Sequence, residues 1–66
     1  MSVAKIIEIS AESSTSFEDA IVQGIAKTSK TIHSIKSAWV KEQQVVVESG
    51  KVVLYRVDLK VTFVLD

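Results

Sequence analysis

The chain has 66 residues, with eight basic and eight acidic side chains, no cysteine and one histidine. This composition excludes disulfides, thiolate metal sites, a cysteine nucleophile and a zinc site built from several histidines. The balanced charge, without a basic run, argues against nucleic acid as a partner. No apolar stretch is long enough to span a membrane, and the N-terminal residues lack the apolar core of a signal peptide. We therefore expect a cytoplasmic protein.

The first part of the chain predicts a strand followed by a helix. Residues Ala4–Ser10 mix β-branched and charged residues at short spacing, which is typical of a strand. The small, polar segment Ala11–Thr15 is expected to form a loop. Ser16 is placed to accept a backbone N–H as the N-cap of a helix, and Asp19, three residues later, to return the bond.

The segment after Ser16 has helical spacing. Steps of four, four, three and four residues place a stripe on one helical face, which we expect to pack on the sheet. The stripe consists of Phe17, Ile21, Ile25, Thr28 and Ile32. Gly24 lies inside this helix, where it costs up to about 1 kcal/mol relative to alanine. A close approach by a strand or by another subunit would explain the glycine.

The rest of the chain predicts a long hairpin. Residues Ile35–Glu48 and Lys51–Leu65 form two strands, and Ser49-Gly50 is a typical turn between them. Both strands exceed the usual five or six residues, which favours a sheet that curls around the helix. The predicted fold class is therefore α+β, in the order β-α-β-β, with a three-stranded antiparallel sheet wrapped around one helix. Residues 1–66 are expected to form a single domain.

The two-residue turn also predicts the register of the hairpin. It places Glu48 opposite Lys51. Pairing each earlier residue of the first strand with the next residue of the last strand then assigns every side chain to one face of the sheet. The odd-numbered residues of the last strand, such as Val57 and Leu59, then face the helix. Beside them, on the helix side, the pairing places Ala38, Val40 and Val46. The opposite face receives Ser37, Trp39, Lys41 and Gln43, together with Arg56, Asp58, Lys60 and Thr62.

Small size and high hydrophobicity together predict an oligomer. A domain of this length buries only about 60% of the surface that its unfolded chain exposes, and it usually needs disulfides, a metal or partner subunits. Here 47% of the residues are hydrophobic, and cysteine is absent. Partner subunits are the remaining way to cover that surface, so we expect a homo-oligomer. A well-packed monomer is the alternative.

No residue constellation predicts catalysis. The single histidine, His33, lies alone near the helix end, and no nucleophile, base and acid occur in a recognisable set. Glycine-rich phosphate loops are absent. Copies of Glu42, Glu48 and Asp58 from several subunits could converge at a symmetry axis and bind Ca²⁺ or Mg²⁺ through oxygens. The alternative is an ordinary solvated or salt-bridged surface. The chain is therefore not expected to be an enzyme.

Several segments resemble the dodecin family. They are the C-terminal run Leu54–Leu65, the Thr-Ser-Phe start of the helix and the Lys-Thr-Ile segment before the second strand. The resemblance covers nearly the whole chain. It implies a hollow sphere of twelve identical subunits that stores or buffers a ligand. Many members bind flavins, stacked between tryptophans of two subunits, and the family is not known for catalysis.

The chain departs from the family pattern at two positions. Ser37 stands where the flavin-stacking tryptophan is usual, and Arg56 stands where a glutamine usually hydrogen-bonds the flavin edge. Losing the aromatic plane removes stacking energy, and arginine offers donors only. Trp39 lies on the same face, roughly 6–7 Å away, as a shifted stacking platform. The alternative is that Trp39 and Arg56 fill a subunit interface.

The sequence thus predicts a ligand site on the face opposite the helix. Its candidate residues are Ser37, Trp39, Gln43, Arg56 and Asp58. The first candidate ligand is a flavin (riboflavin, FMN or FAD) or a similar flat aromatic molecule, held in a homo-dodecamer. The alternative is a structural or calcium-type cation-binding shell, for which Glu42 and Glu48 are weak candidates.

Overall fold

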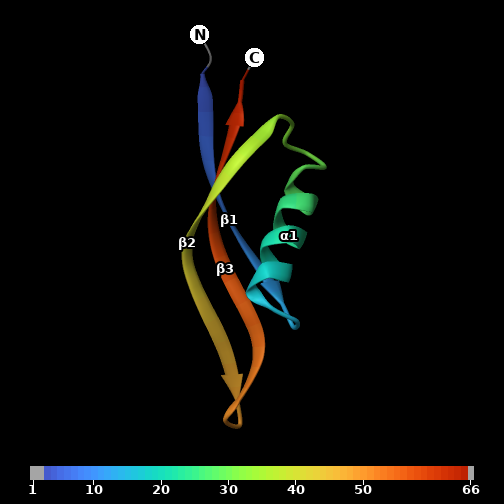
Figure 1. Ribbon diagram of the computed structural model, residues 1–66, viewed down its shortest axis with the longest axis vertical. Helices are drawn as coiled ribbons and strands as arrows, with labels where there is room; N and C mark the ends of the chain where they lie inside the picture. Colours follow the sequence, from blue (N-terminus) through green and yellow to red (C-terminus); the bar gives the residue numbers. More distant parts are fainter. Residues whose placement is uncertain (1–2, 66) are drawn as a thin grey trace.

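The computed structural model describes residues 3–65. The elements follow in the order β1 (Ala4–Ser13), α1 (Phe17–Thr28), β2 (Ile35–Glu48) and β3 (Lys51–Val64). The three strands form one antiparallel sheet in the order β1-β3-β2, with α1 on one face (Figure 1). The predicted α+β fold with β-α-β-β order is therefore confirmed. Within the described part of the chain, the only helix is too short to cross a membrane.

Strand β1 is longer than the sequence predicted. It continues to Ser13, so part of the expected loop at Ala11–Thr15 belongs to the sheet. The reason is the length of β3, which pairs with β1 as far as Ser13 opposite Tyr55. Glu12 consequently lies opposite Arg56, which places a carboxylate beside the arginine.

The start of α1 confirms Ser16 as the N-cap, because its Oγ accepts a hydrogen bond from the Asp19 backbone N–H at 3.0 Å. The predicted return bond from Asp19 to Ser16 was wrong. The Asp19 carboxylate instead accepts a hydrogen bond from the Ser13 hydroxyl at 2.6 Å. Ser13 Oγ in turn accepts hydrogen bonds from the backbone N–H groups of Thr15 and Ser16. A buried serine at the end of β1 therefore ties the strand to the helix start.

Helix α1 ends at Thr28, one turn before the predicted stripe ends at Ile32. The Ile25 and Thr28 carbonyls still accept backbone hydrogen bonds from Ser29 and Ile32, and hydroxyl groups share these acceptors. Ser29 Oγ donates to Ile25 O at 2.8 Å, and Thr31 Oγ1 donates to Thr28 O at 3.4 Å. Such side-chain hydrogen bonds compete with the backbone hydrogen bonds that would continue the helix. Ile32 is therefore half-buried in the turn after the helix.

The core lies between α1 and the two strands that it covers. Ala20, Val57, Leu59 and Val61 are fully buried. Residues packed against them include Ile7, Ile9, Phe17, Ile21 and Ile25. The prediction that Ile21 and Ile25 face the sheet is therefore confirmed.

Gly24 is explained by strand β1. A Cβ atom at this position would lie 2.9 Å from the Ala11 Cβ, closer than two methyl groups can approach. The glycine and the alanine together let the helix lie directly against the strand. Of the two explanations left open by the sequence, the approach of a strand applies.

Three irregularities shift the register of the hairpin, and the third, between Ile35 and Ser37, lies at the start of β2. Glu48 lies opposite Lys51 as predicted, and Ser49 and Gly50 both have positive φ, as a tight hairpin turn requires. One bulge lies between Val46 and Val47, and a second, at Lys41, reverses its effect. Between them the pairing is displaced by one residue.

The displaced register overturns two face assignments. Gln43 lies opposite Val57 on the helix side, and Gln44, in its place, lies opposite Arg56. Val46 lies opposite Leu54, away from the helix, although the sequence predicted the helix side. The pairing rule was correct for Val47 and Glu48 and again from Ser37 to Val40, so Ser37 and Trp39 lie where they were predicted.

Helix α1 packs against β1 and β3 and leaves β2 at the edge uncovered (Figure 1). On the helix side of β2, Val40 is 44% and Val45 is 40% exposed. The sequence predicted that the helix would cover this apolar side. One helix covers only part of the width of a twisted sheet, and so these valines remain accessible.

Candidate ligand-binding face

The sheet face opposite α1, called the open face below, carries four rows of side chains. Directly paired residues in neighbouring strands project to the same side, so each row combines one residue from β1, β3 and β2. The rows are Ile6, Thr62 and Ser37; Glu8, Lys60 and Trp39; Ser10, Asp58 and Glu42; and Glu12, Arg56 and Gln44. Four of the five predicted site residues lie here, and Gln43 does not.

Trp39 provides an exposed aromatic surface on the open face. Its side chain is 60% exposed, and it lies directly across from Lys60 on the central strand. A hollow of about 460 Å³ lies beside it, lined by Ile6, Trp39, Lys41 and Lys60. The bulge in β2 brings Lys41 into this lining. An indole face beside an open hollow can stack a flat ring.

The two lysines of the hollow differ in their ion pairs. Lys41 Nζ lies 3.3 Å from Glu8 Oε1, and both side chains are largely solvent-exposed. Such an exposed pair contributes about 0–1 kcal/mol to stability. Among residues 3–65, Lys60 forms no ion pair. The Lys60 ammonium group, directly across from Trp39, is therefore available to a ligand.

Arg56 is held by both neighbouring strands. Its guanidinium forms an ion pair with Glu12 of β1, and its Nη1 donates to Gln44 Oε1 of β2 at 3.0 Å. Glu12 and Gln44 were missed by the sequence analysis, because β1 was predicted too short and the register shift between Val46 and Val47 was not foreseen. The Arg56 guanidinium is charged, offers donors only and is already bound to Glu12 and Gln44. It therefore does not reproduce the paired donor and acceptor of a glutamine amide.

Ser37 lies one row from Trp39, across from Thr62. The Thr62 hydroxyl is enclosed and has no hydrogen-bond partner within the described residues. At this end of the hollow the face therefore has two small hydroxyl side chains where the family pattern has an indole.

The acidic candidates are only partly brought together. Glu42 and Asp58 are direct cross-strand neighbours, and neither forms an ion pair within residues 3–65. Glu48 lies beside the hairpin turn, opposite Lys51 and apart from this pair. In the described part of the chain, no three acidic or histidine side chains gather around a possible metal position.

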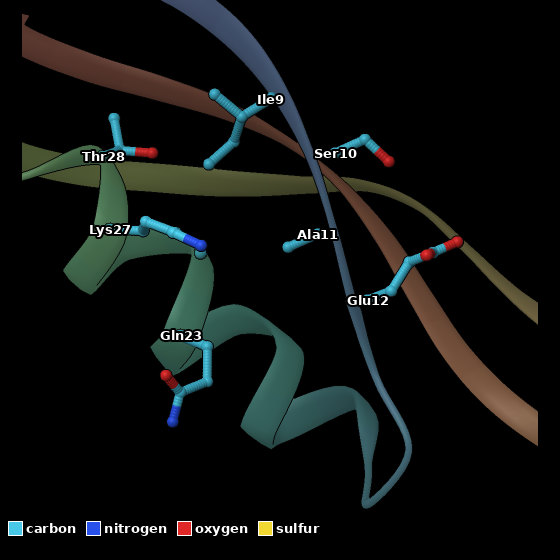
Figure 2. Close-up of a pocket in the computed structure, with 8 residues that line it drawn as sticks. Ile9, Ser10, Ala11, Glu12, Gln23, Lys27 and Thr28 are labelled. Atoms are coloured by element: carbon cyan, nitrogen blue, oxygen red, sulfur yellow. The ribbon is translucent and has the colours of Figure 1, made fainter.

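A second hollow, of about 700 Å³, lies between α1 and the edge of β1. Figure 2 shows Ile9 and Ala11 pointing toward the helix, and Ser10 and Glu12 pointing away from it. Gln23, Lys27 and Thr28 line the helix side of this groove. Because β1 is an edge strand, the groove borders backbone groups that no other strand within residues 3–65 pairs.

Together, the fold and the open face define a small β-α-β-β protein with an accessible aromatic and charged sheet surface. The dodecin family model matches residues 3–66. The chain therefore belongs to the dodecin family.

Individual relatives agree with this assignment. The chain is 36% identical to the calcium dodecin of Mycobacterium tuberculosis over 96% of its own length and 89% of that protein. The dodecin structure from Streptomyces davaonensis superposes with a TM-score of 0.94 at 28% identity, covering 98% of this chain and 96% of that one. The structure of the M. tuberculosis protein, described as having a novel calcium-binding site, gives 0.84 at 33% identity, covering 97% and 91%.

Proposed function

We propose that the chain is a subunit of a hollow homo-dodecamer that binds and stores a flat aromatic ligand, with a flavin as the first candidate. The observation that carries this proposal is Trp39, exposed on the open face beside a hollow of about 460 Å³. Stacking on an indole contributes about 0.5–1.5 kcal/mol beyond the burial of apolar area. The residues of this face suit binding and include no catalytic set.

The assembled form is supported by apolar surface that one subunit leaves accessible. Val40 and Val45 are exposed on the helix side of β2, and both β1 and β2 are edge strands. Edges and apolar strips of this kind are normally covered by a partner.

Light scattering is expected to give a particle of about twelve times the 7.2 kDa subunit mass. The physical reason is the exposed apolar and edge surface, which partner subunits would bury. Dilution to micromolar concentration should leave this mass unchanged. A monomer or dimer at that concentration would contradict the proposed assembly.

Replacing Trp39 with leucine tests the ligand. Riboflavin is expected to bind the parent weakly, and Trp39→Leu should weaken binding about five- to tenfold, the equivalent of about 1–1.4 kcal/mol of stacking. Flavin fluorescence quenching during titration measures both affinities. Val22→Ala is the control, because Val22 is also exposed but lies on α1, on the other side of the sheet from Trp39. Equal quenching by parent and Trp39→Leu, with the oligomer intact, would show that the flavin binds elsewhere.

A calcium-binding shell is the second candidate. It is supported by the direct pairing of Glu42 with Asp58 and by similarity to a relative named calcium dodecin. Like charges directly opposite each other destabilise a sheet, and a cation shared between subunits would relieve the repulsion. The absorption spectrum of the extract from the denatured, purified protein separates the two candidates: released flavin favours the first, and calcium without flavin favours the second.

A further inference from the structure

We propose that the tip of the β2-β3 hairpin is a contact between subunits, in which the tips of two copies of the chain pack against each other about a two-fold axis. The inference rests on the proposed assembly and adds the segment that makes one of its contacts. This segment, called the hairpin arm below, consists of residues 46–54, which are the ends of β2 and β3 and the turn between them.

The hairpin arm extends beyond the other elements of the subunit (Figure 1). Strand β1 pairs with β3 only as far as Ser13 opposite Tyr55, so residues 51–54 pair with β2 alone. The helix begins at the same level, because the Phe17 ring packs edge-on against Tyr55 with the ring centroids 5.2 Å apart. Beyond Tyr55 the subunit is therefore a two-stranded ribbon, which is only marginally stable by itself in water.

The hairpin arm is apolar on both faces. Its apolar residues are Val46, Val47, Val52, Val53 and Leu54. Val46 and Val47 follow each other in β2 and so project to opposite faces of the ribbon. Val47 is 55% and Val52 is 47% exposed, because neither β1 nor α1 reaches this part of the hairpin. Exposed apolar surface on an unsupported ribbon is normally covered by a partner.

The charges of the hairpin arm indicate that the partner is a second copy. Its charged residues, Glu48 and Lys51, lie directly opposite each other, and neither forms an ion pair within residues 3–65. A two-fold contact brings the same patch of two copies together in opposite orientation, so Glu48 of one copy approaches Lys51 of the other. The arm is thus complementary to itself, with valine against valine and acid against base.

Charge reversal tests whether arm meets arm. Glu48→Lys leaves two positive charges on every arm and Lys51→Glu leaves two negative charges, so each variant alone would bring like charges together. Each is expected to dissociate on dilution at a subunit concentration about tenfold or more above that of the parent. When the two variants are co-expressed, opposite arms can pair, and the mixed particle should recover the mass and the dilution behaviour of the parent.

Light scattering over a concentration series measures the dissociation. The control is Lys30→Glu, which makes the same charge change at an exposed position after α1, away from the arm, and should behave as the parent. Single variants that resist dilution like the parent, or a mixture that dissociates as readily as the single variants, overturn the inference and leave the proposed function standing. A parent that is monomeric at every concentration overturns the proposed assembly as well. If a single variant does not fold alone, as judged by circular dichroism, the co-expressed mixture decides.

Val47→Ser tests the apolar part of the contact independently. Because Val47 is 55% exposed in the subunit, serine should leave the circular dichroism spectrum unchanged but remove apolar area from the contact. The variant is expected to dissociate at a concentration about tenfold above that of the parent. Val22→Ser is the matched control, since Val22 is 57% exposed on α1, outside the arm. Identical dissociation of the two variants would contradict a contact through the arm.

Discussion

The double variant Ser37→Trp with Arg56→Gln is expected to bind riboflavin roughly thirty- to hundredfold more tightly than the parent, the equivalent of about 2–3 kcal/mol. Ser37 lies on the open face one row from Trp39, so a new indole there would enlarge the aromatic surface. Glutamine at position 56 would supply a donor and an acceptor in place of a charged group with donors only. Fluorescence quenching during titration measures the gain.

The ion pair of Arg56 determines how this experiment must be controlled. Arg56→Gln leaves Glu12 without its partner, and Gln44 loses a hydrogen bond. Both members of the ion pair are more than a third exposed, so the change should have little effect on stability. The single variants are the matched controls: Arg56→Gln without Ser37→Trp should gain little, because the aromatic plane provides most of the energy.

Two results would contradict the reasoning. Strong quenching by the parent would mean that Trp39 already provides the stacking surface that Ser37 lacks. No gain in the double variant, with the oligomer intact, would mean that the open face serves another ligand. In that case calcium titration of the parent, and of variants at Glu42, Glu48 and Asp58, is the next measurement.

Leu59→Ala is expected to lower the free energy of unfolding by about 2–5 kcal/mol per subunit. Leu59 is fully buried at the centre of β3, between Ile9 and Val40 in the register, and one of its methyl groups approaches Gly24 of the helix. Truncation would remove apolar contacts and leave a cavity under α1. Urea denaturation followed by circular dichroism measures the change. It must be done at a fixed protein concentration, because the stability of an oligomer depends on concentration.

Val22→Ala is the matched control for this experiment. Val22 lies on α1, the helix that packs on β3, yet it is 57% exposed. Its truncation should cost clearly less than that of the fully buried Leu59. If the two variants have the same denaturation midpoint as the parent, the placement of α1 over β3 is contradicted.

Local patterns in the sequence determined the order and type of the elements. The N-cap at Ser16, the turn at Ser49-Gly50 and the helical stripe with Ile21 and Ile25 each depend on residues close in sequence, and all three were predicted correctly. The position of Trp39 on the open face followed from counting residues back from the hairpin turn. The dodecin family assignment likewise came from short segments spread over the chain.

Only the tertiary structure decided how the open face is composed. The bulge between Val46 and Val47 depends on how two long strands twist together, and it exchanged Gln43 for Gln44 beside Arg56. The ion pair between Arg56 and Glu12 joins residues far apart in sequence and required β1 to continue to Ser13. The exposure of β2 depends on where one helix lies across a sheet wider than itself. These features arise from pairing and packing between distant segments, which no local sequence pattern encodes.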